Sequence, residues 1–257
     1  YWKWIRNMFR GDLGQSFQWN QPVAQLIGDR IGLTFVISFS TLIMSWLLAI
    51  PIGVYSATHQ YSILDYFFSG SAFIGVALPN FLIAMALLWF AWTTFGANLA
   101  GLFSSEYADA PWSLGKVLDL LKHLWVPLVI LGTGGIAGQV RILRANLLDE
   151  MRKPYVITAR SKGLTERRVL YKYPFRIAMN PFFSTIGWAL PGLISGTTII
   201  SIVLNLPTSG PMLLNALRAQ DMYLAGSFLM ILSALTVIGT FISDLLLAWV
   251  DPRIRFG

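Results

Sequence analysis

Few residues in this sequence could carry out covalent or metal chemistry. Its 257 residues include no cysteine, which excludes disulfides, thiolate metal ligands and a cysteine nucleophile. The two histidines, His59 and His123, fall in segments that we expect at opposite faces of a membrane, so they cannot share a metal ion. No phosphate-binding loop of the form G-x-x-x-x-G-K-[ST] occurs. The sequence therefore predicts no catalytic set, no metal site and no enzyme activity of its own.

The glycine-rich run at 132–138 comes nearest to a nucleotide-binding motif. It lies inside an apolar helical segment rather than after a strand, where a dinucleotide motif would stand. Small residues in an apolar helix let a neighbouring helix approach closely. We therefore expect this run to serve helix packing.

The most informative stretch for function is the basic segment at 151–173. Pro154 suits the first turn of a helix. Gly163 suits the position after the helix end, where a positive φ costs little only for glycine. Thr165 can then cap a second short helix, which Pro174 limits. The segment therefore predicts two short helices joined at a glycine.

A helix, a glycine and a second helix form a shape that fits the groove of a partner protein. Met151, Tyr155 and Ala159 recur at four-residue spacing and predict an apolar-to-small stripe, and Leu164 can supply the apolar contact after the glycine. The alternative interpretation is a basic loop solvated by lipid headgroups.

The composition places the chain in a membrane. Of its residues 55% are hydrophobic and only 12% are charged, whereas soluble domains carry about 25% charged residues. Apolar segments that can cross a bilayer need about 20 residues. We predict an all-α integral membrane protein with five transmembrane helices, the second kinked at Pro79, at about 31–58, 66–95, 124–140, 181–204 and 222–250.

The basic residues predict the direction of these spans. Residues 141–176 hold ten Lys or Arg against three acidic residues, and the positive-inside rule places such a block in the cytoplasm without invoking nucleic acid. Alternation then puts the loops 97–123 and 205–221 outside and the tail 251–257 in the cytoplasm. Residues 1–30 would be an extracytoplasmic or interfacial segment, and we expect a sixth span to precede them.

At the two short helices predicted within 151–173, the chain resembles the permease subunits of ABC importers of the oligopeptide, dipeptide and nickel class. That class carries a cytoplasmic signature that commonly reads Tyr-Val-x-Thr-Ala-Arg-Ala-Lys-Gly-Leu. It is matched here by Tyr155, Val156, Thr158, Ala159, Arg160, Lys162, Gly163 and Leu164, with Ile157 where the general signature has Glu. Three further pieces agree in family order, namely 11–16 with 22–23, then 219–221, and 251–255.

The resemblance implies a type I ABC importer permease fold, with 31–250 as the transmembrane domain of a bacterial or archaeal cytoplasmic membrane protein. It implies that the signature residues at 151–173 couple the chain to two cytosolic ATPase subunits, which bind ATP and Mg. We expect Gly163 and Ala159 to make the close contact. A second, homologous permease and an extracytoplasmic substrate-binding protein are the other implied partners. Alternating access would then import peptides or similar small solutes. Metal chelates and small glycosides are the alternative cargo classes.

Two pairs of residues are predicted to face the translocation path. Pro79 with Asn80, and Pro191 with Gly192, lie where a proline frees a backbone carbonyl inside a span. The alternative is plain helix packing.

Other transporter classes stay open from the sequence alone. An ion- or proton-coupled secondary transporter needs an intramembrane charge or a broken helix. The best candidate residue for it is Asp244, near the cytoplasmic end of the last span. A channel is a third option, although no filter-like motif occurs.

Overall fold

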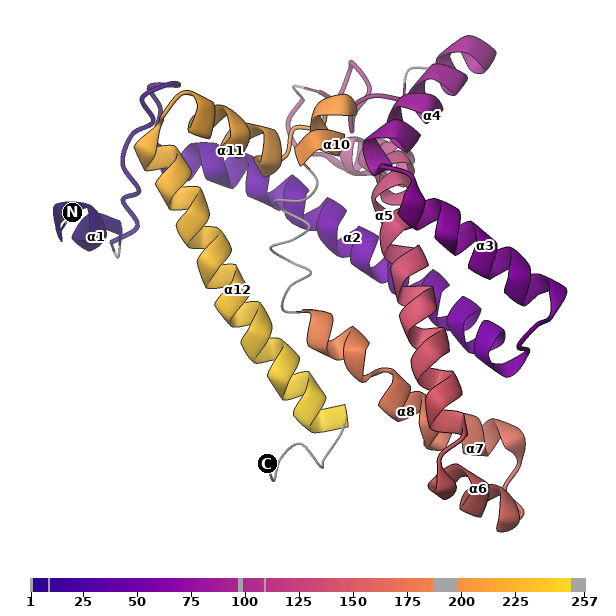
Figure 1. Ribbon diagram of the computed structural model, residues 1–257. Helices are drawn as coiled ribbons and strands as arrows, with labels where there is room; N and C mark the ends of the chain where they lie inside the picture. Colours follow the sequence, from indigo (N-terminus) through magenta and orange to yellow (C-terminus); the bar gives the residue numbers. More distant parts are fainter. Residues whose placement is uncertain (1, 9, 97–98, 109, 187–197, 251–257) are drawn as a thin grey trace. The chain divides into compact units, whose positions relative to one another are not determined.

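The computed structural model in Figure 1 describes residues 2–8, 10–96, 99–108, 110–186 and 198–250. Its regular elements in these ranges are the α-helices α1 (Trp2–Met8), α2 (Val23–Thr58), α3 (Ile63–Ala77), α4 (Asn80–Phe95), α5 (Leu114–Met151), α6 (Pro154–Ser161), α7 (Glu166–Lys172), α8 (Pro174–Ala178), α10 (Thr198–Val203), α11 (Ser209–Arg218) and α12 (Met222–Val250). The chain divides into two compact units. The first holds Tyr1–Thr41, Asn80–Leu131 and Leu190–Val237, and the second holds Leu42–Pro79, Gly132–Ala189 and Ile238–Gly257.

Long apolar helices confirm that the chain is an all-α, multi-pass membrane protein. Among the described residues, α2, α5 and α12 are each long and apolar enough to cross a bilayer, and α3 with α4 passes the same test as one broken span. These elements correspond to four of the five predicted spans. The remaining predicted span, 181–204, includes residues 187–197, which lie outside the described residues, and α10 covers most of its end.

The second predicted span is two helices rather than one kinked helix. α3 ends at Ala77, Leu78 has an extended backbone (φ −88°, ψ 128°), and α4 begins at Asn80. The ring of Pro79 clashes with a helical conformation at the residue before it, which drives that residue into the extended region. The predicted continuous helix over 66–95 is therefore wrong at this point.

The third predicted span begins earlier than expected, because α5 starts at Leu114 rather than near 124. The extra turns contain Lys116 and Asp119, whose charges are satisfied by the preceding loop. The Asp119 carboxylate accepts hydrogen bonds from the backbone N–H and the hydroxyl of Ser104, both at 2.7 Å. Lys116 Nζ donates to two backbone carbonyls at 2.6 and 3.3 Å. Because these charges have partners, the helix extends into the region predicted as a loop.

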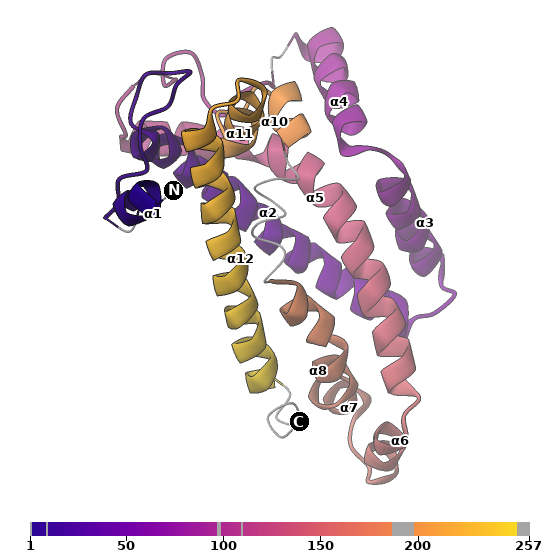
Figure 2. The same ribbon diagram turned by 60° about the vertical axis from the view of Figure 1, so that its left-hand side comes forward.

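In the first unit, one core cluster joins three helix segments. α11 lies beside the start of α12 and near the N-terminal part of α2 (Figures 1 and 2). The buried side chains that they share are Val23, Leu26, Ile27, Met212, Ala216, Leu224, Ala225 and Phe228. Because its first turn is packed in this way, α2 begins at Val23 rather than at the predicted residue 31.

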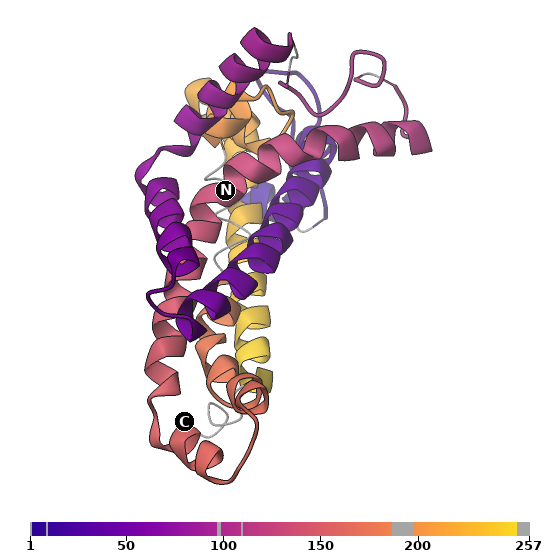
Figure 3. The same cartoon turned by 90° about the vertical axis from the view of Figure 1, so that its right-hand side faces the viewer.

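In the second unit, the C-terminal half of α5 packs closely against α2 and α3 (Figure 3). A Cβ added to Gly53 of α2 would lie 3.0 Å from the Leu143 Cβ of α5. One added to Gly75 of α3 would lie 3.3 Å from the Ala137 Cβ of the same helix. Glycine therefore lets both neighbours approach α5, as small residues do between membrane helices.

The predicted packing role of the run 132–138 is confirmed at one of its glycines. A Cβ on Gly132 would meet the Met44 side chain at 2.5 Å, whereas the same position on Gly138 faces open space. Only the first of these two positions therefore lies in close contact with a neighbouring helix.

Candidate functional site

The two short helices predicted between the third and fourth spans are present. Lys153 is extended and Pro154 opens α6, while Gly163 follows the helix end with φ +76°. Thr165 is extended and precedes α7, although its side chain makes no capping hydrogen bond. α7 ends at Lys172, before Pro174. Pro154 and Gly163 thus predict the start of α6 and the corner after it, whereas the predicted capping bond of Thr165 is not formed.

A small apolar cluster holds α6 against α7. Val156, Ala159 and Val169 are buried in it, and Tyr155, Leu164 and Tyr173 pack on its edge. The predicted apolar contact of Leu164 is confirmed. Met151 belongs instead to the cluster formed with the ends of α2 and α5, because the extended Lys153 starts α6 on a new axis.

Polar contacts also hold the corner. Arg160 Nε donates to Glu166 Oε1 at 3.0 Å, which links the end of α6 to the start of α7 across the glycine. The Tyr155 hydroxyl donates to the Glu150 carboxylate at the end of α5. The Glu166 side chain is 72% exposed, and ion pairs at such positions contribute about 0–1 kcal/mol. Packing and the glycine corner therefore hold the shape more than this ion pair does.

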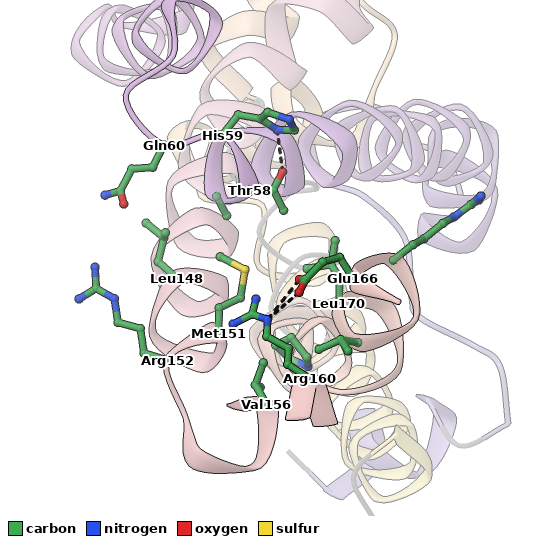
Figure 4. A pocket seen from close by; sticks show the side chains of 14 residues that line it. Thr58, His59, Gln60, Leu148, Met151, Arg152, Val156, Arg160, Glu166 and Leu170 are labelled. Carbon is green, nitrogen blue, oxygen red and sulfur yellow. Dashed lines mark hydrogen bonds and ion pairs between the residues drawn. The ribbon is translucent and has the colours of Figure 1, made fainter. Parts of the chain in front are cut away.

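The two helices form part of the wall of a hollow of about 660 Å³ (Figure 4). Another part comes from the end of α2 and the following turn, 57–60, and a third from the end of α5. Arg160 is turned toward Glu166 (Figure 4). The charged lining residues are three cations and one acid, namely Arg152, Arg160, Arg167 and Glu166. The hollow therefore combines apolar side chains such as Leu148 and Leu170 with charged ones.

Four of the eight signature residues are exposed, and two, Val156 and Ala159, are buried. Thr158, Arg160, Lys162 and Gly163 are exposed, whereas Ala159 is 5% exposed inside the cluster between α6 and α7. A Cβ on Gly163 would meet nothing within 4 Å, so its conformation rather than its lack of a side chain explains the glycine here. The outward face of α6 instead presents Ile157, which is 55% exposed. This residue stands where the general signature has Glu.

The residues predicted to face the translocation path are only partly described. Pro79 is exposed and Asn80 is half-buried at the break between α3 and α4. Pro191 and Gly192 lie outside the described residues. Asp244 is exposed on α12, next to Ser243, whose hydroxyl donates to the Phe183 carbonyl at 2.7 Å. The described residues include no group of three or more His, Cys, Asp or Glu side chains that could hold a metal ion.

Two distant sequence pieces, 11–16 and 219–221, meet at one buried carboxylate. Asp221 is fully buried and accepts a hydrogen bond from the Ser16 hydroxyl at 2.5 Å and from the backbone N–H groups of Gln18 and Leu224, each at 3.2 Å. Burial alone would raise the pKa of this carboxyl. The hydrogen bonds favour its charged form and outweigh burial, so its pKa lies below the ordinary value of 3.8.

One ion pair in the second unit was not predicted from the sequence. Asp65 at the start of α3 pairs with Arg144 of α5, at 2.8 Å between Oδ2 and Nη2. A signal was present, because Asp65 is the single charge that separates the two uncharged intervals 31–64 and 66–105. The sequence did not indicate which of the ten cations at 141–176 is its partner.

The chain is similar to known proteins over nearly its full length. Residues 49–256 match the family described as binding-protein-dependent transport system inner membrane component. The chain is 33% identical over 257 residues to the oligopeptide transport system permease protein AppB of Bacillus subtilis, covering 100% of this chain and 80% of that protein. It is 32% identical over 258 residues to the peptidoglycan transport system permease protein YejB of Agrobacterium fabrum, covering 97% and 70%.

A solved structure shares the fold. An inward-facing form of the MetNI methionine ABC transporter matches with a TM-score of 0.66 at 15% identity, covering 88% of this chain and 97% of that chain. This likeness confirms the predicted fold of an ABC importer permease.

Proposed function

We propose what this chain does from one premise: it belongs to the family of binding-protein-dependent transport system inner membrane components. It is a multi-pass membrane permease of an ABC importer, and the relatives do not support the ion-coupled alternative. We infer that its cargo is a peptide or a similar small solute, because its relatives are named as oligopeptide and peptidoglycan transport permeases. The permease would import this cargo by alternating access.

One observation supports the site of energy coupling. A chain with no phosphate-binding loop carries two short helices, joined at Gly163 and projecting beyond α5, in its most basic segment (Figure 1). We propose that α6 and α7 dock on cytosolic ATPase subunits, which bind ATP and Mg. We propose accordingly that residues 151–173 and the tail 251–257 lie on the cytoplasmic side of a bacterial or archaeal membrane.

The contact surface differs from the one that the signature alone implies. Ala159 is buried between α6 and α7, so we propose that it sets their spacing rather than touching the ATPase. Ile157, Thr158 and Lys162 are exposed on or next to α6 and are the better candidates for direct contact. An exposed apolar side chain such as Ile157 gains most from being covered by a partner, because its burial removes apolar surface from water.

The remaining partners follow from the family. A second homologous permease would complete the translocation path, and an extracytoplasmic binding protein would deliver the cargo. Asn80, half-buried beside a break in a span, remains our candidate polar contact along the path. Cysteine at position 80 should react with small aqueous thiol reagents in at least one transport state, and protection in every state would favour plain helix packing.

Co-purification in mild detergent tests the function. The chain should travel with two ATPase copies and a second permease. In proteoliposomes, an equimolar mixture of unmodified di- to pentapeptides should stimulate ATP hydrolysis only when the external binding protein is added. Uptake driven by an ion gradient in the purified chain without an ATPase would overturn the proposal, and Asp244 would then be the first residue to replace.

A further inference from the structure

We propose that Asp65 and Arg144 are positioning residues for transport, because their ion pair ties the turn between α2 and α3 to α5. A displacement of α6 and α7 at the end of α5 would then carry α3 with it. The proposal rests on the proposed function, since it concerns how ATPase docking moves the spans.

The pair has the geometry of a fork. Arg144 Nε donates to Asp65 Oδ1 at 2.9 Å, and Nη2 donates to Oδ2 at 2.8 Å. The Asp65 side chain is 3% exposed and that of Arg144 is 25% exposed. Two parallel charge-assisted bonds fix direction as well as distance. A lysine would keep the charge at this position but not the fork.

The same carboxylate also organises the turn before α3. Asp65 Oδ2 accepts from the Tyr61 backbone N–H at 2.9 Å, and Oδ1 accepts from the Ser69 hydroxyl at 3.3 Å. The Ser62 hydroxyl in turn accepts from the Asp65 backbone N–H at 3.2 Å, which caps α3. Donors from the turn, from α3 and from α5 therefore converge on one side chain.

The elements that this ion pair joins also line the hollow of Figure 4. His59 and Gln60 of the turn lie along it, and so do Leu148 and Met151, which follow Arg144 on α5 by one and two helical turns. α6, α7 and Pro174 of α8 complete the lining. The ion pair therefore sets how far the turn lies from the two short helices.

Stability alone is a weak reason for such a pair. Replacing a buried ion pair by apolar residues is often neutral or stabilising, because burial costs each charge its hydration. What the fork supplies is orientation between two elements. We therefore expect its loss to change coupling, which is measured as peptide taken up per ATP hydrolysed.

The test uses the full complex in proteoliposomes, with the same di- to pentapeptide mixture. Asp65→Asn and Arg144→Gln should each lower the uptake per ATP by about twofold to thirtyfold, the range over which single residues modulate coupling. The double variant should regain part of the loss, because it leaves no lone buried charge. Arg141→Gln is the matched control, since Arg141 is exposed on the same helix and has no ion-pair partner among the described residues.

A second readout does not depend on transport. In this cysteine-free chain, the thiol-labelling rate of Gln60→Cys reports the mobility of the turn, and Arg144→Gln should raise it while Arg141→Gln should not. If the wild-type complex shows no peptide-stimulated ATP hydrolysis, the proposed function fails, and the labelling result still decides whether the pair holds the turn.

Three outcomes would overturn the positioning role. The first is unchanged uptake per ATP and unchanged labelling in the variants, whatever their melting temperature. The second is an equal effect of Arg141→Gln. If Asp65→Asn and Arg144→Gln do not accumulate in the membrane, the same assays are run on Arg144→Lys, because this variant keeps the cation. Failure of that variant to accumulate is the third outcome, since the pair would then serve folding.

Discussion

Replacing Gly163 tests whether the shape of the corner between α6 and α7 governs docking. The residue has φ +76°, and a Cβ there would meet nothing within 4 Å. Steric clash therefore contributes nothing, and the whole cost of Gly163→Ala is conformational. A left-handed conformation costs an L-residue about 1–2 kcal/mol, which corresponds to about a fivefold to thirtyfold change in an equilibrium.

The assay is titration of the purified permease with its ATPase subunit. Gly163→Ala should weaken the apparent affinity by about fivefold to thirtyfold. Gly163→Asn should weaken it less, because asparagine tolerates the left-handed region. Membrane insertion should be unaffected, since the corner lies outside the long apolar helices.

Gly11→Ala is the matched control for this experiment. Gly11 has φ +84° and is likewise surrounded by open space, but it lies in the first unit. It should carry a similar strain with unchanged ATPase affinity. Wild-type affinity in Gly163→Ala, or an equal loss in Gly11→Ala, would refute the reasoning.

Three further predictions concern the rest of the chain. The folded-state pKa of Asp221 lies below 3.8, so the stabilising effect of the carboxylate is complete at neutral pH and is lost only as pH falls through that lower pKa. Asp221→Asn should therefore lower the free energy of unfolding by about 1–3 kcal/mol at pH 7. A difference in melting temperature from wild type that grew on acidification would contradict this. Gly210→Ala should lower the melting temperature, because its Cβ would lie 3.0 Å from the Thr198 backbone, whereas Gly32→Ala, with open space around it, should raise stability by about 0.5–1 kcal/mol. A tag inserted at 160–170 should be reached only from the cytosol, and labelling from outside would end the docking proposal.

The sequence by itself determined the features that depend on local rules. Apolar length predicts α2, α5 and α12 as spans, since a bilayer imposes a minimum run on any helix that crosses it. Pro154 and Gly163 predict where α6 begins and ends, because each restricts or permits a backbone conformation at its own position. These features do not depend on what packs against them.

Only the tertiary structure decided the features that need a distant partner. The early start of α5 depends on Ser104, which satisfies Asp119. The burial of Ala159 depends on Val169 of the next helix, and this removes from the proposed contact surface a residue that the signature suggests. The Asp65–Arg144 pair joins residues 79 positions apart, and any of ten cations in the basic block could have been the partner. The residue type limits the bonds that a side chain can make. The packing of α3 against α5 decides which of these bonds Asp65 forms.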